Sequence, residues 1–372
     1  MAYNPYSLRA IFEDITLDLI ASMRRNLKRH MAEQEKEGFA WEQWQSAKLR
    51  ELARYQRENR ALFADREAEI QKTIVQTLAD AFRRGETRAE REIIEIMKLL
   101  FPADLSGKGL APPARETAFF GMNRQKLQAL QESVAGDIET ASQAVLRKMD
   151  DVYRQTIFRA EMHMSTGAKT LPQAVDMAAK DFLNAGVQSI AYKDGRRVNI
   201  TSYSEMALRT ASVRATLLGE GMKRDEWDVH TVVVSAHASA CELCIPWQRR
   251  VLIDDVYSEG KPDGRHPLLS EAMDAGLFHP NCRHLISTYF PGITALPKPI
   301  NEDTARRNYE AEQKQRYMER QIRKWKRREA GSLDPENREE ARAKIKEWQE
   351  KIRDHLDDHP QLRRAPRREK IA

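Results

Sequence analysis

The sequence has few residues of the kinds that build membrane spans and turn-rich β folds. It contains no run of 18 or more apolar residues, so no membrane-spanning helix is expected. Its first residues, MAYNPYSLRA, lack a basic region followed by an apolar stretch, and we expect no export by the general secretory route. The chain has 16 glycines in 372 residues, a share below the roughly 7% typical of proteins. This scarcity argues against a β fold with many tight turns.

Signatures of common catalytic and nucleotide-binding sites are also missing. The sequence contains no GxxxxGK[ST] phosphate loop, no GxGxxG motif after a strand, no GxSxG elbow and no HExxH helix. These absences disfavour P-loop enzymes, dinucleotide enzymes, α/β-hydrolases and zincin proteases.

The residues that are abundant favour long helices. Charged residues make up 32% of the chain and hydrophobic residues 41%, which is typical of a protein with a large solvated surface. Apolar residues recur at spacings of three and four, as in Leu8, Ile11, Phe12, Ile15, Leu19 and Met23. This periodicity predicts helices over 5–35, 41–63, 66–84, 86–101, 122–165 and 202–219, with Gly85 as a helix stop.

Two short β elements interrupt the helical pattern. The run Thr231–Val234 is rich in β-branched residues and predicts a strand. Asp194–Gly195 lies between two extended runs and predicts a hairpin. The fold class expected is therefore mostly α with a small α+β module.

Composition divides the chain into five regions, and the length alone predicts two to three domains at roughly 150 residues each. The segment FPADLSGKGLAPPARE is rich in Pro and Gly and indicates a linker. The expected regions are an N-terminal helical region 1–101, a linker 102–121, a central helical region with a hairpin 122–220, a Cys/His-containing α+β module 221–300 and a charged helical region 301–372.

The net charge of +6 is concentrated near the C-terminus. Residues 301–372 contain 21 Lys and Arg against 16 Asp and Glu, an excess of five. The signs alternate in blocks, which favours a salt-bridged helical hairpin over a dedicated DNA-binding face. Trp325 is expected to pack against the helix that contains Trp348, with stacking on a base as the alternative. A weak contact with DNA phosphates is predicted for Arg323, Lys324, Lys326, Arg327, Arg328, Arg363, Arg364, Arg367, Arg368 and Lys370.

All three cysteines lie close to histidines in one region. The motif CELC supplies Cys241 and Cys244, and HPNCRH supplies His279 and Cys282. Three sulfurs and one imidazole make a closed tetrahedral site, which is typical of structural zinc. His284 is an alternative ligand. Reduced thiols packed as small hydrophobic groups, or a disulfide that leaves one cysteine over, are the alternatives to metal.

Two enzymatic hypotheses stand beside a structural role. In a zinc-dependent nuclease, His279 or His284 would activate water and Asn281 would orient that base, with Asp254 and Asp255 as the only acidic pair available for a second metal. In a group-transfer enzyme, Arg209 and His237 would lie in a pocket. We expect neither activity.

The motifs together suggest a family. VVVSAHASACELCIPWQRRVLI, followed by GLFHPNCRHLISTYFPG, resembles the signature region of tailed-phage minor capsid proteins of the minor capsid protein 2 group. It is also similar to the wider Mu F-like head-morphogenesis domain, in which CxxC, Trp-Gln and HPxCR steps recur. Upstream, YKDGRRVNITSYSEMALRTASVRA resembles the Tyr-x-x-Gly-Arg segment and Arg-Thr helix of the same group. The terminal helices, with Trp41 and Trp44 at one end, are similar as well.

This chain departs from the Mu F-like pattern in one position, because His284 stands where many relatives have a final Cys. Members of the minor capsid group often lack the CxxC, so metal is an option within the architecture. The residues shared with the group are then expected to form a buried polar network. They are His237, Trp247, Gln248, Asn281, Arg283 and His284.

The resemblance implies a non-enzymatic head protein of a phage virion. It implies a place inside the head near the portal, after synthesis in the host cytoplasm, and a role in head assembly, DNA packaging or ejection. The partners implied are the portal protein, the major capsid protein and, weakly, packaged DNA. We also expect homo-oligomers, no membrane partner and, as the single cofactor, structural zinc.

Overall fold

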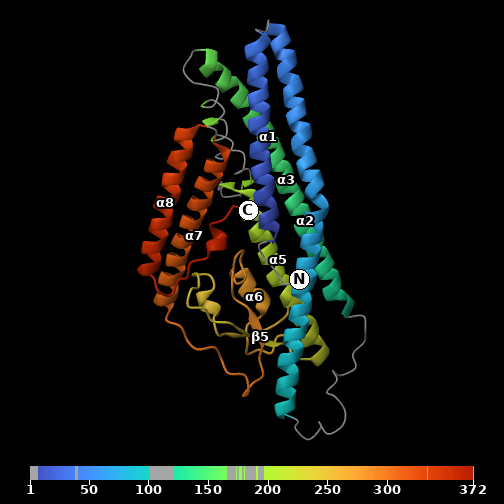
Figure 1. The fold of residues 1–372 in the computed structure, drawn as a ribbon. Helices are drawn as coiled ribbons and strands as arrows, with labels where there is room; N and C mark the ends of the chain where they lie inside the picture. Colours follow the sequence, from blue (N-terminus) through green and yellow to red (C-terminus); the bar gives the residue numbers. More distant parts are fainter. Residues whose placement is uncertain are drawn as a thin grey trace. The chain divides into compact units, whose positions relative to one another are not determined.

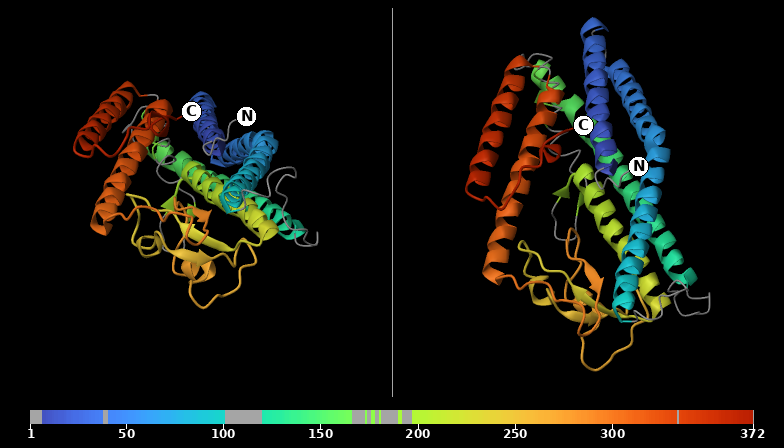
Figure 2. Two further views of the ribbon diagram at one scale, coloured as in Figure 1. Left: turned by 90° about the horizontal axis from the view of Figure 1, so that it is seen from below. Right: turned by 60° about the horizontal axis from the view of Figure 1, so that its bottom comes forward.

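The computed structural model confirms a mostly α fold with a small α+β module (Figures 1 and 2). It describes residues 7–37, 41–100, 120–165, 173, 176–177, 180, 190–191, 197–332 and 334–371. Most of the predicted linker 102–121 therefore lies outside the described residues, as do Tyr192, Asp194, Gly195 and Arg196. None of the helices in these ranges is both long enough and apolar enough to cross a bilayer.

The chain forms two compact units, each assembled from separate stretches of sequence. The Cys/His unit comprises Met1–Pro5, Lys72–Ala135 and Met206–Glu312, and the helical unit comprises Tyr6–Gln71, Gly136–Glu205 and Gln313–Ala372. Four of the long helices contribute residues to both units. The division into five regions, which follows the sequence from end to end, stays a prediction.

The helical unit is built on apolar stripes of long helices. Helix α1 (Ser7–Glu37) confirms the first predicted helix. Leu8, Ile11, Phe12, Ile15, Leu19 and Met23 are all buried, at 0–7% exposure. Helix α3 (Phe120–Ser165) confirms the helix predicted over 122–165. From α3, Tyr153 stacks on Tyr55 of helix α2 (Trp41–Leu100) with ring centroids 4.0 Å apart. Burial of these stripes, more than helix propensity, stabilises helices of this length.

The prediction of separate helices over 41–63, 66–84 and 86–101 was wrong. One helix, α2 (Trp41–Leu100), runs for 60 residues and passes through Gly85 without a break. In the Cys/His unit, a Cβ on Gly85 would lie 2.0 Å from the carbonyl oxygen of Thr216 in helix α5 (Ile200–Trp227). Gly85 therefore lets the two helices approach closely. A glycine inside a helix is roughly 1 kcal/mol less favourable than an alanine, and the close packing offsets this destabilisation.

The C-terminal helices form the predicted charged hairpin. Helices α7 (Glu302–Gly331) and α8 (Pro335–Asp357) lie side by side (Figures 1 and 2). Within the helical unit, Trp325 and Trp348 pack against one cluster formed by Met318, Ile322, Ile345 and Ile352. This confirms the expected packing of the two tryptophans on a shared apolar seam.

A three-stranded antiparallel sheet organises the Cys/His unit. The strand order is β4 (Val251–Ile253), β3 (Thr231–Val234), β5 (Ile286–Thr288). The central strand β3 is the one predicted from sequence, and it pairs Val233 with both Val251 and Ser287. Helix α6 (Leu269–Asp274) follows β4. In the helical unit, strands β1 (Ile190–Ala191) and β2 (Arg197–Val198) pair antiparallel, as the predicted hairpin requires, and its turn at Asp194–Gly195 lies outside the described residues.

Candidate metal centre

The Cys/His cluster is assembled at one end of the three-stranded sheet. The CELC segment follows β3, and the HPNC segment precedes β5. Because β3 and β5 pair antiparallel, the end of β3 meets the start of β5, and Ser235 donates its N–H to the carbonyl of Leu285 at 2.9 Å. This pairing brings segments nearly 40 residues apart to the same edge.

Each segment closes a tight turn that aims its two donor side chains the same way. In CELC, the N–H of Cys244 donates to the carbonyl of Cys241 at 3.1 Å, and in HPNC the N–H of Cys282 donates to the carbonyl of His279 at 2.9 Å. The two-residue gap between donors thus corresponds to a single turn in both segments. The 3₁₀ helix Ile245–Trp247 continues directly from CELC.

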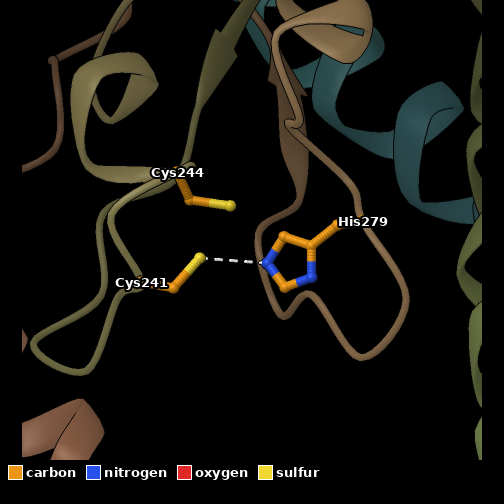
Figure 3. Close-up of side chains that lie close together, drawn as sticks. All are labelled: Cys241, Cys244 and His279. Carbon is orange, nitrogen blue, oxygen red and sulfur yellow. Dashed lines mark hydrogen bonds between the residues drawn. The ribbon is translucent and has the colours of Figure 1, made fainter. Parts of the chain in front are cut away.

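The His279 ring of one turn faces the Cys241 and Cys244 sulfurs of the other (Figure 3). Cys241, Cys244 and His279 form one group whose donor atoms lie within 4.8 Å of one another. Cys244, Cys282 and His284 form a second such group. The two groups share Cys244, so the three sulfurs and both candidate imidazoles surround one region of the unit.

The donor separations fit a tetrahedral metal better in the group of Cys244, Cys282 and His284 than in the group of Cys241, Cys244 and His279. Zinc bonds of about 2.3 Å to sulfur and about 2.05 Å to nitrogen place tetrahedral S···S pairs about 3.8 Å apart and S···N pairs about 3.5 Å apart. The Cys244 and Cys282 sulfurs lie 3.6 Å apart, and Cys282 Sγ lies 3.5 Å from His284 Nδ1. Cys241 Sγ lies 3.0 Å from His279 Nε2, which is a hydrogen-bond separation.

Both histidines present features of a ligand. Nδ1 of His279 donates to the carbonyl of Pro280 at 2.8 Å, which leaves the Nε2 lone pair directed at the Cys241 sulfur. A backbone carbonyl in this position orients metal-binding imidazoles in many proteins. His284 is 3% exposed, and its Nδ1 lies 3.5 Å from the Cys282 sulfur. His279 is grouped with the sulfurs of Cys241 and Cys244, and His284 with those of Cys244 and Cys282, so both imidazoles stay candidates for the fourth ligand.

The cysteines differ in their affinity for protons. The hydrogen bond between Cys244 and Cys282 raises the pKa of the Cys244 thiol, and burial adds to that effect. The same bond lowers the pKa of Cys282, with further help from hydrogen bonds to His284. Of the two thiols, Cys282 is therefore the one that loses its proton more readily. Metal binding would release that proton, because the ligand form of cysteine is the thiolate.

The residues predicted as a polar network are only partly brought together. The N–H of His237 donates to Oε1 of Gln248, and the His237 ring meets the His284 ring edge-on at 4.8 Å between centroids. Burial, followed by the nearby His284, lowers the pKa of His237 and favours its neutral ring.

Arg283 also joins His237 through a backbone hydrogen bond, whereas the other side chains predicted for the network have different surroundings. Trp247 lies beneath the Arg250 guanidinium at 5.5 Å from the ring centroid. Arg283 forms an ion pair with Glu312, and Asn281 is exposed.

The acidic residues considered for a second metal are committed to other bonds. Asp254 is fully buried, and its Oδ2 accepts from Nε and an NH2 group of Arg224 at 3.0 and 2.6 Å. Asp255 accepts from the N–H of Ser270 at 2.9 Å. Arg209, considered for group transfer, lines a cavity whose described lining does not include His237.

Sequence reasoning missed Arg224, the largest fully buried side chain of the described chain. Its partner Asp254 also accepts from the N–H of Tyr257 at 2.9 Å through Oδ1. The ion pair therefore fastens α5 to the loop after β4. A single arginine on a helix gives no signal of this role, because its partner is 30 residues away.

Residues predicted to contact DNA occupy two different environments in the helical unit. Arg323 and Arg327 are buried, at 7% and 8% exposure, and Arg327 donates to Oε2 of Glu13 at 2.8 Å. Arg368 lies 3.9 Å from a carboxylate oxygen of Glu319, and Arg364 donates to both oxygens of Glu369. Lys326 and Arg328 are half-buried. The exposed members are Lys324, Arg363, Arg364, Arg367 and Lys370.

Comparison with known proteins agrees with the resemblance seen in the motifs. A protein named "Structural protein" from Lactococcus phage LL-H is 25% identical over 226 residues, which are 59% of this chain and 61% of that protein. The alignment thus spans about three-fifths of that relative's length. A second "Structural protein", from Lactococcus phage mv4, is 40% identical over 102 residues, 26% of this chain and 83% of that protein.

No solved structure matches the chain significantly. The family described as Phage minor capsid protein 2 matches residues 4–357, a range that includes the long helices, the sheet and all five candidate ligands. The chain belongs to the phage minor capsid protein 2 family.

Proposed function

We propose that this chain is a non-enzymatic structural protein of a tailed-phage head, bound to the portal and to the capsid interior. There it supports head assembly, DNA packaging or ejection. The observation that carries the proposal is the family match over residues 4–357, which takes in both compact units. The "Structural protein" names of two phage relatives support a place in the virion.

The fold supplies what such a role requires. Long helices with one buried and one solvated face form a rigid scaffold, and the solvated faces are available for partner proteins. The exposed cations near the C-terminus, Lys324, Arg363 and Arg367, are suited to weak, salt-sensitive contact with packaged DNA. Asp254 and Asp255, which a two-metal nuclease would need, are held in internal bonds.

The virion role is tested by following the protein through assembly. We expect mass spectrometry of gradient-purified particles to find the chain in DNA-filled heads, and cross-linking to join it to the portal protein. An amber mutant should give particles that lack the chain and are defective in assembly, packaging or ejection. Particles that lack the chain and infect normally would contradict the proposal, as would a chain found only in free, soluble fractions of the lysate.

We further propose that the Cys/His cluster holds one structural zinc ion, with the three cysteines and one of the two histidines as ligands. A closed set of four protein ligands leaves no position for an activated water, so the ion would stabilise the fold. It would join the turn after β3 to the turn before β5. The proposal is supported by the 3.6 Å S···S and 3.5 Å S···N separations.

Elemental analysis tests the zinc proposal, and paired variants identify the fourth ligand. The protein as purified should carry about one zinc per chain, and Cys244→Ser should carry none. Of His279→Ala and His284→Ala, the variant that removes the ligand should lose zinc, and the other should keep it. His266→Ala is the matched control, because His266 bonds to Asp263 outside the cluster. A folded wild-type protein with no metal would refute the proposal.

A further inference from the structure

Two sulfurs of the Cys/His cluster lie close enough to bond to each other. All three cysteines are free thiols, and the sulfurs of Cys244 and Cys282 are 3.6 Å apart. Because a disulfide has an S–S length of about 2.05 Å, the two sulfurs need to approach by only about 1.5 Å. The backbone holds the two segments opposite each other, since the N–H of Ser235 donates to the carbonyl of Leu285 at 2.9 Å.

The two cysteines differ in their access from solvent. Cys244 is 1% exposed, whereas Cys282 is partly exposed and lines a cavity between α5 and the segment before β5. The exposed residues Arg214 and Asn281 also line this cavity, so it reaches the surface. Its volume for water-sized molecules is about 30 Å³, and a single water needs roughly 10–15 Å³ of such space. It therefore admits a molecule of two oxygen atoms and is too small for a bulky oxidant such as glutathione disulfide.

We propose that Cys282 is a site of oxidation by hydrogen peroxide and that Cys244 completes a disulfide with it. An accessible cysteine beside a second cysteine that resolves it is typical of redox-sensitive pairs. Cys282 has the first role because the cavity leads to it. Cys244 has the second role because it is buried and its sulfur contacts that of Cys282.

The reaction balances with peroxide as the oxidant. The Cys282 sulfur attacks one peroxide oxygen, an S–O bond forms, the O–O bond breaks, and the leaving hydroxide takes the thiol proton to become water. The Cys244 sulfur then attacks the Cys282 sulfur, an S–S bond forms, the S–O bond breaks, and the second hydroxide leaves as water with the Cys244 proton. The two thiols together lose two electrons, and one peroxide is reduced to two waters.

The disulfide and the proposed zinc ion exclude each other, because both use the same two sulfurs. Oxidation would replace a metal link between the turn after β3 and the turn before β5 with a covalent one. Only the release of metal rests on the zinc proposed above, since the disulfide forms from the thiols themselves. The virion role proposed above would supply the occasion, because particles pass from the reducing host cytoplasm to an exterior in which disulfides persist.

Peptide mapping of the full-length protein as purified tests the pairing. The folded protein is treated with excess hydrogen peroxide, its remaining thiols are blocked with iodoacetamide, and the unreduced chain is digested with a protease that cleaves after Glu. Cleavage at Glu242 separates Cys241 from Cys244, so mass spectrometry distinguishes all three possible pairs. We expect a linked peptide that joins Cys244 to Cys282, an alkylated Cys241, and loss of the link on reduction with dithiothreitol.

A control in urea shows whether the native fold selects the pair. In the unfolded chain, Cys241 and Cys244 are separated by two residues, whereas Cys244 and Cys282 lie 38 positions apart. Closing the longer loop costs more entropy, so oxidation in urea should lose its preference for Cys244 and Cys282. In the folded protein, a chromogenic chelator should detect one zinc released for each disulfide formed.

Each other result contradicts the proposal. A main product that joins Cys241 to Cys244 would overturn it, and so would conversion of Cys282 to a sulfinic acid without a linked peptide, or no reaction with excess peroxide. The same pair formed in equal yield in urea would also overturn it, because the fold would then have no part in the selection. The zinc content of untreated protein and the presence of the chain in heads are measured separately, so failure here is distinguishable from failure of either proposed function.

Discussion

The buried cluster of charges around Glu13 makes a sharp prediction about stability. Glu13 is 1% exposed, and its carboxylate accepts two hydrogen bonds from Arg327. Guanidinium nitrogens of Arg9 and Arg323 lie 4.0 Å from the same carboxylate. Glu13 thus faces three cations, of which Arg9 has a second partner in Glu205 at 3.4 Å. Removal of the anion should therefore cost more than removal of any one cation.

We expect Arg327→Met to destabilise the protein by about 3 kcal/mol, at the lower end of the range for breaking a buried pair, because Arg9 and Arg323 still face Glu13. Glu13→Gln should cost about 4–5 kcal/mol, because it leaves the guanidinium groups to repel one another in a buried site. That repulsion is already evident in Arg323, where burial and then Arg9 and Arg327 lower the pKa to about 10. The double variant should cost less than the sum of the single variants by about 1.5–3 kcal/mol.

Urea unfolding followed by circular dichroism measures these differences from the shift of the midpoint at constant slope. Arg342→Met is the matched control, because Arg342 pairs with Glu329 at 2.7 Å on the surface, with the arginine side chain 61% exposed. An exposed pair of this kind contributes no more than about 0.5 kcal/mol. If Arg327→Met cost no more than Arg342→Met, or if Glu13→Gln were the milder of the two substitutions at Glu13 and Arg327, the description of the cluster would be wrong.

Three further predictions concern pH, DNA and helix packing. Burial raises the pKa of Glu220 from 4.5 to about 7. The protonated carboxyl therefore contributes its full stability below pH 4.5, and this contribution is lost as pH rises to 7. Thermal melts should show a melting temperature that falls over this range, and Glu220→Gln should make the fall smaller. Lys324→Gln should weaken retention of the protein on a DNA column at low salt and reduce the salt dependence of that retention. Arg323→Gln should lower the stability of the fold and leave the salt dependence unchanged. Equal elution of Lys324→Gln and the wild type would contradict the predicted DNA contact. Gly219→Ala should lower the melting temperature, because its Cβ would lie 2.1 Å from the carbonyl oxygen of Phe82, whereas Gly136→Ala, with no atom within 4 Å, should raise it.

Local patterns were sufficient for much of the fold and for the members of the candidate site. The apolar spacing of α1 and α3 predicted both helices, because a helix that buries one face must repeat its apolar residues every three to four positions. The β-branched run Thr231–Val234 predicted β3. The spacing of CELC and HPNC predicted two ligand pairs, because a tight turn places side chains three positions apart on the same side.

Long-range packing decided the rest. Gly85 was taken as a helix stop, but the close approach of α5 gives the glycine a different use inside one helix of 60 residues. Arg323 and Arg327 have the same local signature as Lys324, a basic residue in a charged helix. Only the packing of α1 against α7 in the helical unit buries the two arginines beside Glu13 and leaves the lysine in solvent.

The sequence by itself determined that this chain is mostly helical, which residues could bind a metal and which family the motifs resemble, because these properties are written in local spacing and residue type. Tertiary structure alone decided that Cys244 is common to two groups of donors and that Asp254 is neutralised by Arg224. Each of these depends on the distance between side chains far apart in the chain. Such distances are set by strand pairing and helix packing, which no local pattern contains.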